Sequence, residues 1–220
     1  MKICVITNGR KELSVRLPPC DFALFGFGAL GGVDYESELS GKTEKFEQVA
    51  KLSRAADCGV FCGCVTDSRG LKRKSVAVAS GGKLLGISDM LNVFEGEEYK
   101  CGASLGVYCV GGYKVGLCID NDLYFPETVK ACAMCGCNLL VVHAEEVADG
   151  IPPLLIRAYA YLYGLPVVLC AGGTAFFADV TGVVASSNQD VAVFETSARN
   201  SYRCVTTRRR GIFQTDPDDF

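Results

Sequence analysis

Short apolar runs recur along the whole chain, and Gly, Asp, Ser or Asn residues separate them. Many of these runs are rich in valine, a composition typical of buried strands. The pattern predicts strands at residues 2–7, 22–25, 59–65, 75–79, 106–110, 115–119, 139–142, 166–169, 174–178, 191–195 and 202–206.

Helical periodicity is less frequent. Residues 43–56 place Phe46, Val49 and Leu52 on one face with charges opposite, which predicts an amphipathic helix. Residues 127–135 and 153–163 predict two further helices, the second with proline near its start. Strands and helices alternate in the middle of the chain, and hairpin-like strand pairs lie around them. The pattern predicts an α/β sandwich of two sheets with helices outside, in one domain over residues 1–214. We expect residues 215–220 to form a disordered acidic tail.

Composition narrows the classes of partner. Hydrophobic residues make up 49% and charged residues 21% of the chain, which suits a globular protein with a large core. The formal charge of −3 gives no reason to expect nucleic acid or a membrane surface as partner. The first residues lack the pattern of a signal peptide, and no apolar run approaches the roughly 20 residues that span a bilayer. A cytoplasmic location is therefore expected.

Cysteine is unusually frequent, with 13 residues. Most lie in apolar strands, where a thiol behaves as a small buried hydrophobe. Cys132 and Cys135 form a CxxC pair that offers zinc binding or redox chemistry as an alternative. The chain has one histidine and no second pair at zinc-finger spacing. We therefore expect buried, reduced thiols, and neither a metal nor a cofactor.

The most informative segment is an apolar strand that enters a polar turn and then a helix. Ile119, Asp122, Phe125, Pro126 and Glu127 stand in the order Ile-x-x-Asp-x-x-Phe-Pro-Glu. This segment resembles the nucleophile elbow of the carbon–nitrogen hydrolase (nitrilase) superfamily, roughly Ile-Cys-Tyr-Asp-x-x-Phe-Pro-Glu. Weaker matches follow the family order across residues 20–210, at residues 21–30, 42–56, 58–65, 74–86, 94–102 and 172–182.

The resemblance implies a fold of four layers, α-β-β-α, with two sheets inside and helices on the outer faces. Only residues 8–21 separate the first two predicted strands, so the family's first outer helix is expected to be missing. The resemblance also implies a nitrilase-like domain over residues 1–214.

The catalytic residues of the family are replaced in this register. Family chemistry uses a glutamate as general base, a lysine that stabilises the tetrahedral intermediate and a cysteine nucleophile. These positions fall on Phe27, Met90 and Asp120, so no catalytic residue is predicted with assurance. The accessory glutamate of the family falls on Glu97. Its neighbours at positions 95 and 98, also glutamates, leave open which of the three faces the pocket.

Two interpretations of Asp120 remain open. It is either a carboxylate nucleophile or an acid that caps the following helix, where free backbone N–H groups favour negative charge. Either those N–H groups or a nearby cation would hold the carboxylate ionised, and we expect the N–H groups. Asn121 follows it, and the only histidine, His143, ends the next strand at the border of the family's pocket. Asp120, Asn121 and His143 are the predicted binding residues.

Two functional hypotheses follow. The first is a nitrilase-fold pseudoenzyme that binds a small-molecule ligand or a partner subunit. The alternative is a divergent amide or nitrile hydrolase with a rearranged site around Asp120, Glu97 and His143.

The resemblance also implies assembly through helices. The helices at residues 128–135 and 153–163 are apolar around most of their circumference, which favours a homodimer through them. The competing hypothesis is that the segment after Arg208 covers them within one chain.

Overall fold

The structure is a computed structural model, and it describes residues 1–7, 13 and 16–196. The predicted strand at residues 202–206, the segment after Arg208 and the tail at residues 215–220 lie outside the described residues.

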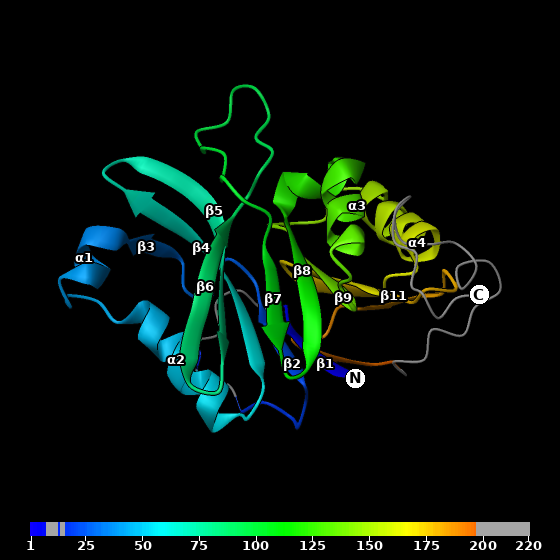
Figure 1. Ribbon diagram of the computed structural model, residues 1–220, viewed down its shortest axis with the longest axis horizontal. Coiled ribbons are helices and arrows are strands. Elements are labelled where there is room, and N and C mark those ends of the chain that lie inside the picture. The colour runs from blue at the N-terminus through cyan, green and yellow to red at the C-terminus, as the bar shows by residue number, and fades with distance from the viewer. Residues whose placement is uncertain (8–12, 14–15, 197–220) are drawn as a thin grey trace, which may run out of the picture.

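The molecule consists of two sheets packed face to face, with helices on both outer sides (Figure 1). In the first sheet β1 and β2 pair in parallel, as do β2 and β4, and the remaining neighbours along the main order are antiparallel. Its order is β13 (Val191–Glu195), β1 (Lys2–Ile6), β2 (Phe22–Phe25), β4 (Gly59–Ser68), β5 (Leu71–Ser80) and β6 (Lys83–Asp89), with β3 (Gly32–Asp34) also paired to β4.

The second sheet carries its parallel strands in the centre. Strands β8, β9 and β10 run parallel, and β9 and β10 are buried along their whole length. Continuous apolar runs such as these are typical of strands that are covered on both faces. The order is β12 (Val184–Ser187), β11 (Thr174–Ala178), β10 (Val167–Ala171), β9 (Leu139–His143), β8 (Tyr113–Ile119) and β7 (Val107–Val110).

Helices cover each outer face. Helix α2 (Lys45–Ala55) packs on β4, β5 and β6, and a short helix α1 (Tyr35–Leu39) lies next to β3. Helices α3 (Pro126–Met134) and α4 (Ile151–Tyr163) cover the second sheet on the opposite side (Figure 1). Helix α4 begins two residues before the predicted start because proline is tolerated in a first helical turn, where the backbone N–H has no partner.

The predicted α/β sandwich is therefore confirmed. Its inner layer joins apolar side chains of both sheets in one cluster, with Phe22, Phe61, Val115 and Val141 among its members. The segment from β1 to β2 includes residues 8–12 and 14–15, which lie outside the described residues, so the absence of a first outer helix stays a prediction. Within the described part of the chain, no helix is long and apolar enough to cross a membrane.

Candidate functional site

The elbow between β8 and α3 is a sharp turn with an unusual backbone. Strand β8 ends at Ile119, a 3-10 helix η1 (Asp120–Tyr124) follows, and α3 begins at Pro126. Asp120 has a φ of 51°, in the left-handed region that residues other than glycine seldom adopt. Aspartate tolerates this region better than most side chains. The turn therefore presents the Asp120 carboxylate at the end of the second sheet.

Asp122 fixes this turn to the segment that follows β6. Its buried carboxylate accepts hydrogen bonds from the Leu91 and Asn92 backbone N–H groups at 2.9 Å each, and from the Ile119 N–H at 3.1 Å. The Asn92 side-chain amide donates a further one at 2.9 Å. Burial raises the pKa of Asp122, and these hydrogen bonds to the ionised form oppose that shift. Asp122 thus holds Leu91 and Asn92 against the elbow.

A lysine that the sequence reasoning missed occupies the site. Lys74 lies in β5 with a side chain only 8% exposed, and its ammonium pairs with the Asp120 carboxylate. The same ammonium lies 2.9 Å from a carboxylate oxygen of Glu145 and 5.0 Å from the ring centroid of Tyr99. Burial alone lowers the pKa of Lys74, but hydrogen bonds to Asp120 and Glu145 outweigh it and raise the pKa. We call Lys74, Asp120 and Glu145 the ion cluster.

Met90, the predicted lysine position, is a backbone neighbour of this cation. The Met90 N–H donates to the Lys74 carbonyl at 2.8 Å, and the Met90 side chain is completely buried. The cation therefore comes from the adjacent strand β5. The signal that could have revealed it is a lysine that directly precedes the apolar run of residues 75–79.

The structure distinguishes between the three glutamates of the following loop. The Asn121 side-chain amide donates to the Glu97 carboxylate at 2.9 Å, which places Glu97 beside the elbow. Glu98 instead pairs with Lys72 at 2.8 Å, where both side chains are exposed. Glu95 is exposed. Of the three, Glu97 is the one in contact with a predicted site residue.

Phe27 and His143 meet inside the sandwich. Their rings lie edge to face with centroids 6.5 Å apart, and His143 is completely buried. Neither imidazole nitrogen has a hydrogen-bond partner of normal geometry among the described residues. Burial lowers the pKa of His143 to about 4, so the ring is neutral at pH 7. His143 therefore contributes an apolar contact to Phe27, and no hydrogen bond joins it to the ion cluster.

The expectation that elbow N–H groups hold the Asp120 carboxylate is wrong. Its partners are the Lys74 ammonium and, at 3.4 Å, the backbone N–H of Glu145. In the part of the chain that the structure describes, no N–H of residues 121–124 donates to it. The reason is electrostatic: an ammonium in direct contact stabilises a partly buried carboxylate more than the N–H groups of one helical turn do.

Cys118 is the cysteine that precedes the elbow in β8. It is fully buried and belongs to the apolar cluster beneath α3, together with Cys132. The predicted burial of most cysteines holds for the described residues, because only Cys101, Cys109 and Cys135 are exposed. No group of three His, Cys, Asp or Glu side chains in the described ranges is arranged to hold a metal ion.

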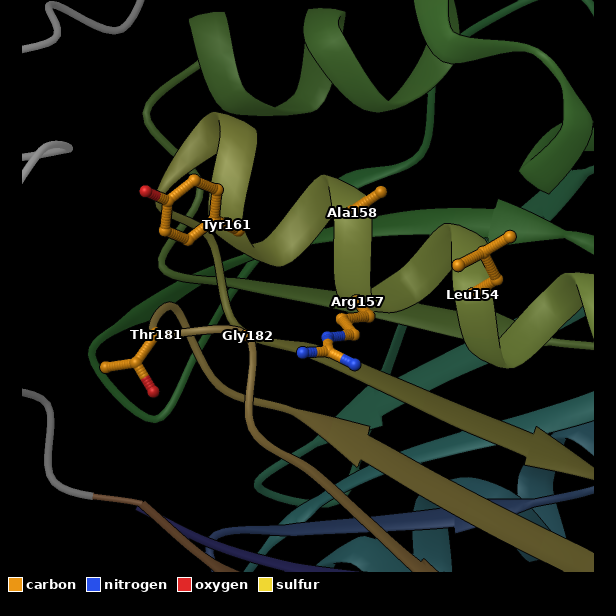
Figure 2. Close-up of a pocket in the computed structure, with 6 residues that line it drawn as sticks. All are labelled: Leu154, Arg157, Ala158, Tyr161, Thr181 and Gly182. Carbon is orange, nitrogen blue, oxygen red and sulfur yellow. The ribbon is translucent and has the colours of Figure 1, made fainter.

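An open groove lies between α4 and the turn after β11 (Figure 2). Its volume is about 390 Å³. The groove combines α4 with the turn after β11, and its walls are formed by Leu154, Arg157, Ala158, Tyr161, Thr181 and Gly182. None of these residues was predicted to belong to the site.

Comparison with known proteins identifies the fold. No protein-family model and no curated protein matches the sequence. Solved structures do match. An amidase from Nesterenkonia sp. superposes with a TM-score of 0.70 and 16% identity over 95% of this chain and 93% of that one. A variant of the Nesterenkonia sp. AN1 amidase, with acrylamide added at its active-site cysteine, gives a TM-score of 0.71 and 16% identity over 95% and 96%. Another variant of this amidase, in complex with butyramide, gives a TM-score of 0.66 and 17% sequence identity, over 84% of this chain and 85% of that one.

The chain therefore has the fold of the amidases of the nitrilase superfamily, as the elbow motif predicted. At this level of identity the similarity establishes the fold alone.

Proposed function

We propose that this chain is a nitrilase-fold protein without carbon–nitrogen hydrolase activity, and that its elbow end binds a small-molecule ligand or a partner subunit. The observation that supports the proposal is the ion cluster. At the elbow position where the family has its cysteine, this chain has Asp120 bound to a buried Lys74 ammonium.

The chemistry of the cluster argues against covalent catalysis. Lys74 is held protonated, so it has no lone pair with which to attack a carbonyl or nitrile carbon. One Asp120 oxygen is engaged by that ammonium, and the other accepts the Glu145 N–H. Attack by Asp120 requires this ion pair to open, and the partly buried carboxylate would then lose its principal partner.

The alternative is a rearranged hydrolase that uses Asp120, Glu97 and His143. Two observations favour it. The Asp120 side chain, presented by a left-handed turn, is 17% exposed, and Glu97 contacts the adjacent Asn121. His143 counts against it, because this ring packs on Phe27 inside the sandwich and its low pKa makes it a poor base.

A search for a covalent adduct tests the proposal. The purified protein is incubated with a panel of amides and nitriles, and the mass of the intact chain and of the peptide that contains residue 120 is measured. We expect no added mass on that peptide. Asp120→Cys is the matched control, because a thiol at this position should react with acrylamide if small molecules reach the elbow. An acyl adduct on Asp120 would contradict the proposal and establish the alternative.

We also propose that the chain forms a homodimer through α3 and α4. Large apolar side chains are exposed on this side, with Leu154 at 59%, Leu162 at 48% and Met134 at 44%. Exposed apolar side chains on adjacent helices mark interaction surfaces. An isologous pair of these faces would bury them.

A further inference from the structure

Three thiols gather at one edge of the first sheet, away from the ion cluster. Cys4 lies in β1, Cys20 lies two residues before β2, and Cys58 directly precedes β4. These strands are adjacent and parallel, so their N-terminal ends meet at the same edge of the sheet. All three cysteines contact the apolar cluster beneath α2, with Cys4 and Cys58 buried in it and Cys20 packed against it.

The backbone brings Cys20 and Cys58 together. The Gly59 N–H donates to the Asp21 carbonyl at 2.9 Å, and each cysteine directly precedes one of these two residues. Phe22 pairs with Gly59, so Cys20 and Cys58 are offset by one residue on strands that lie about 4.8 Å apart, and both contact the same apolar cluster. Cys4 lies further inside its strand, where its register partner is Ala23.

Cys20 is the central and most accessible member of the group. Cys20 precedes β2, the middle of the three strands, and so lies between Cys4 of β1 and Cys58 before β4. Cys4 is completely buried and Cys58 is 6% exposed, whereas Cys20 is partly exposed. Cys20 is therefore the one of the three sulfurs that a dissolved oxidant reaches most easily.

The pKa directions agree with this geometry. Hydrogen bonds from Cys4 and then from Cys58 lower the pKa of Cys20, against the effect of its partial burial. The pKa values of Cys4 and Cys58 are raised, first by the hydrogen bond to Cys20 and then by burial. The positive charge of Lys2 favours the Cys20 thiolate, and the negative charge of Asp21 opposes it.

We propose that Cys20 is an oxidant-reactive thiol and that Cys58 resolves its oxidised form as a disulfide. The oxidant class is a hydroperoxide, with hydrogen peroxide as the simplest member. The Cys20 sulfur attacks one peroxide oxygen, so that an S–O bond forms, the O–O bond breaks and one water leaves after protonation. The Cys58 sulfur then attacks the sulfenic sulfur, so that the S–S bond forms, the S–O bond breaks and a second water leaves with the Cys58 proton. Two thiols are oxidised and one peroxide is reduced to two waters.

The disulfide would join two positions that the fold already holds on neighbouring strands. Cys20 and Cys58 directly precede Asp21 and Gly59, and a backbone hydrogen bond joins those two residues. Cys4 is not consumed and remains a buried thiol. A small thiol such as dithiothreitol should restore both thiols by exchange.

Competitive alkylation tests the reactivity of Cys20. The folded full-length chain is treated with limiting iodoacetamide at pH 6, and each cysteine peptide is quantified by mass spectrometry. We expect Cys20 to react at least about tenfold faster than the exposed Cys101 and Cys109, because an ordinary thiol is almost fully protonated at this pH. Equal rates for Cys20 and these two controls would overturn the proposal.

Peptide mapping after treatment with one equivalent of hydrogen peroxide tests the resolving step. The wild-type chain should yield a Cys20–Cys58 disulfide that dithiothreitol reverses. Cys58→Ser should instead accumulate a dimedone-reactive sulfenic acid at Cys20, and Cys101→Ser should behave as wild type. The disulfide found in the wild-type chain tests the proposal by itself, without a variant. Oxidation at Cys101 or Cys109 ahead of Cys20, or a disulfide that excludes Cys20, contradicts the proposal.

Discussion

Replacement of Lys74 by methionine isolates the electrostatic role of the ion cluster. Methionine keeps much of the apolar stem of lysine and removes its charge. The change leaves the Asp120 and Glu145 carboxylates without their shared cation, with side-chain exposures of 17% and 64%. Breaking a fully buried ion pair from one side costs about 3–5 kcal/mol. Glu145 is well hydrated and contributes little, so we expect Lys74→Met to lower the free energy of unfolding by about 2–3 kcal/mol.

The assay is urea denaturation followed by far-UV circular dichroism, because the chain contains no tryptophan. Lys72→Met is the matched control on the same strand. Its partner Glu98 lies at 2.8 Å, but both side chains are exposed, so no measurable change is expected. The double variant Lys74→Met/Asp120→Asn should recover about 1 kcal/mol or more of the loss, because it removes the stranded charge of Asp120. If Lys74→Met is no more destabilising than Lys72→Met, the ion cluster is not the interaction described here.

Three other predictions concern pH, packing and assembly. Burial lowers the pKa of His143 from 6.5 to about 4 in the folded chain. As the pH falls from 6.5 to 4, the unfolded chain protonates this histidine and the folded chain does not, so the free energy of unfolding should fall by about 3 kcal/mol. His143→Phe should not show this loss of stability when urea denaturation is measured between pH 6.5 and 4. Identical pH dependence in the wild-type chain and the variant would contradict the role of His143. Gly63→Ala should destabilise by about 1–3 kcal/mol, because an added Cβ would lie 2.9 Å from the Phe27 backbone nitrogen; an unchanged urea midpoint would contradict the close packing. Sedimentation at micromolar concentration should give a dimer that Leu154→Glu or Ala131→Glu dissociates. The control Leu39→Glu, at an 86% exposed residue on α1, should leave the dimer intact. A wild-type monomer of 23.5 kDa refutes the dimer.

The fold was predictable because its signals are local and ordered. Phe125, Pro126 and Glu127 follow the elbow at the spacing of the family motif, and the short valine-rich runs at residues 139–142 and 166–169 favour buried strands. The same register placed Asp120 at a sharp polar turn, and the structure adds that its backbone is left-handed, with a φ of 51°.

The partner of Asp120 was not predictable in the same way. Lys74 and Asp120 are 46 residues apart, and their contact depends on how the two sheets face each other. A lysine at the start of an apolar strand is more often solvated, so its burial is decided by tertiary packing alone. The same holds for His143, whose pocket-border position did not reveal that its ring turns inward onto Phe27.

The most direct test of the account is turnover by the purified chain on simple amides and nitriles, measured as ammonia release and compared with Asp120→Asn. The account predicts that both proteins stay at the protein-free rate, since no thiolate attacks from the elbow and the Lys74 ammonium is bound to Asp120. Turnover by the wild-type chain that disappears in Asp120→Asn would contradict the account and establish a hydrolase that uses this carboxylate.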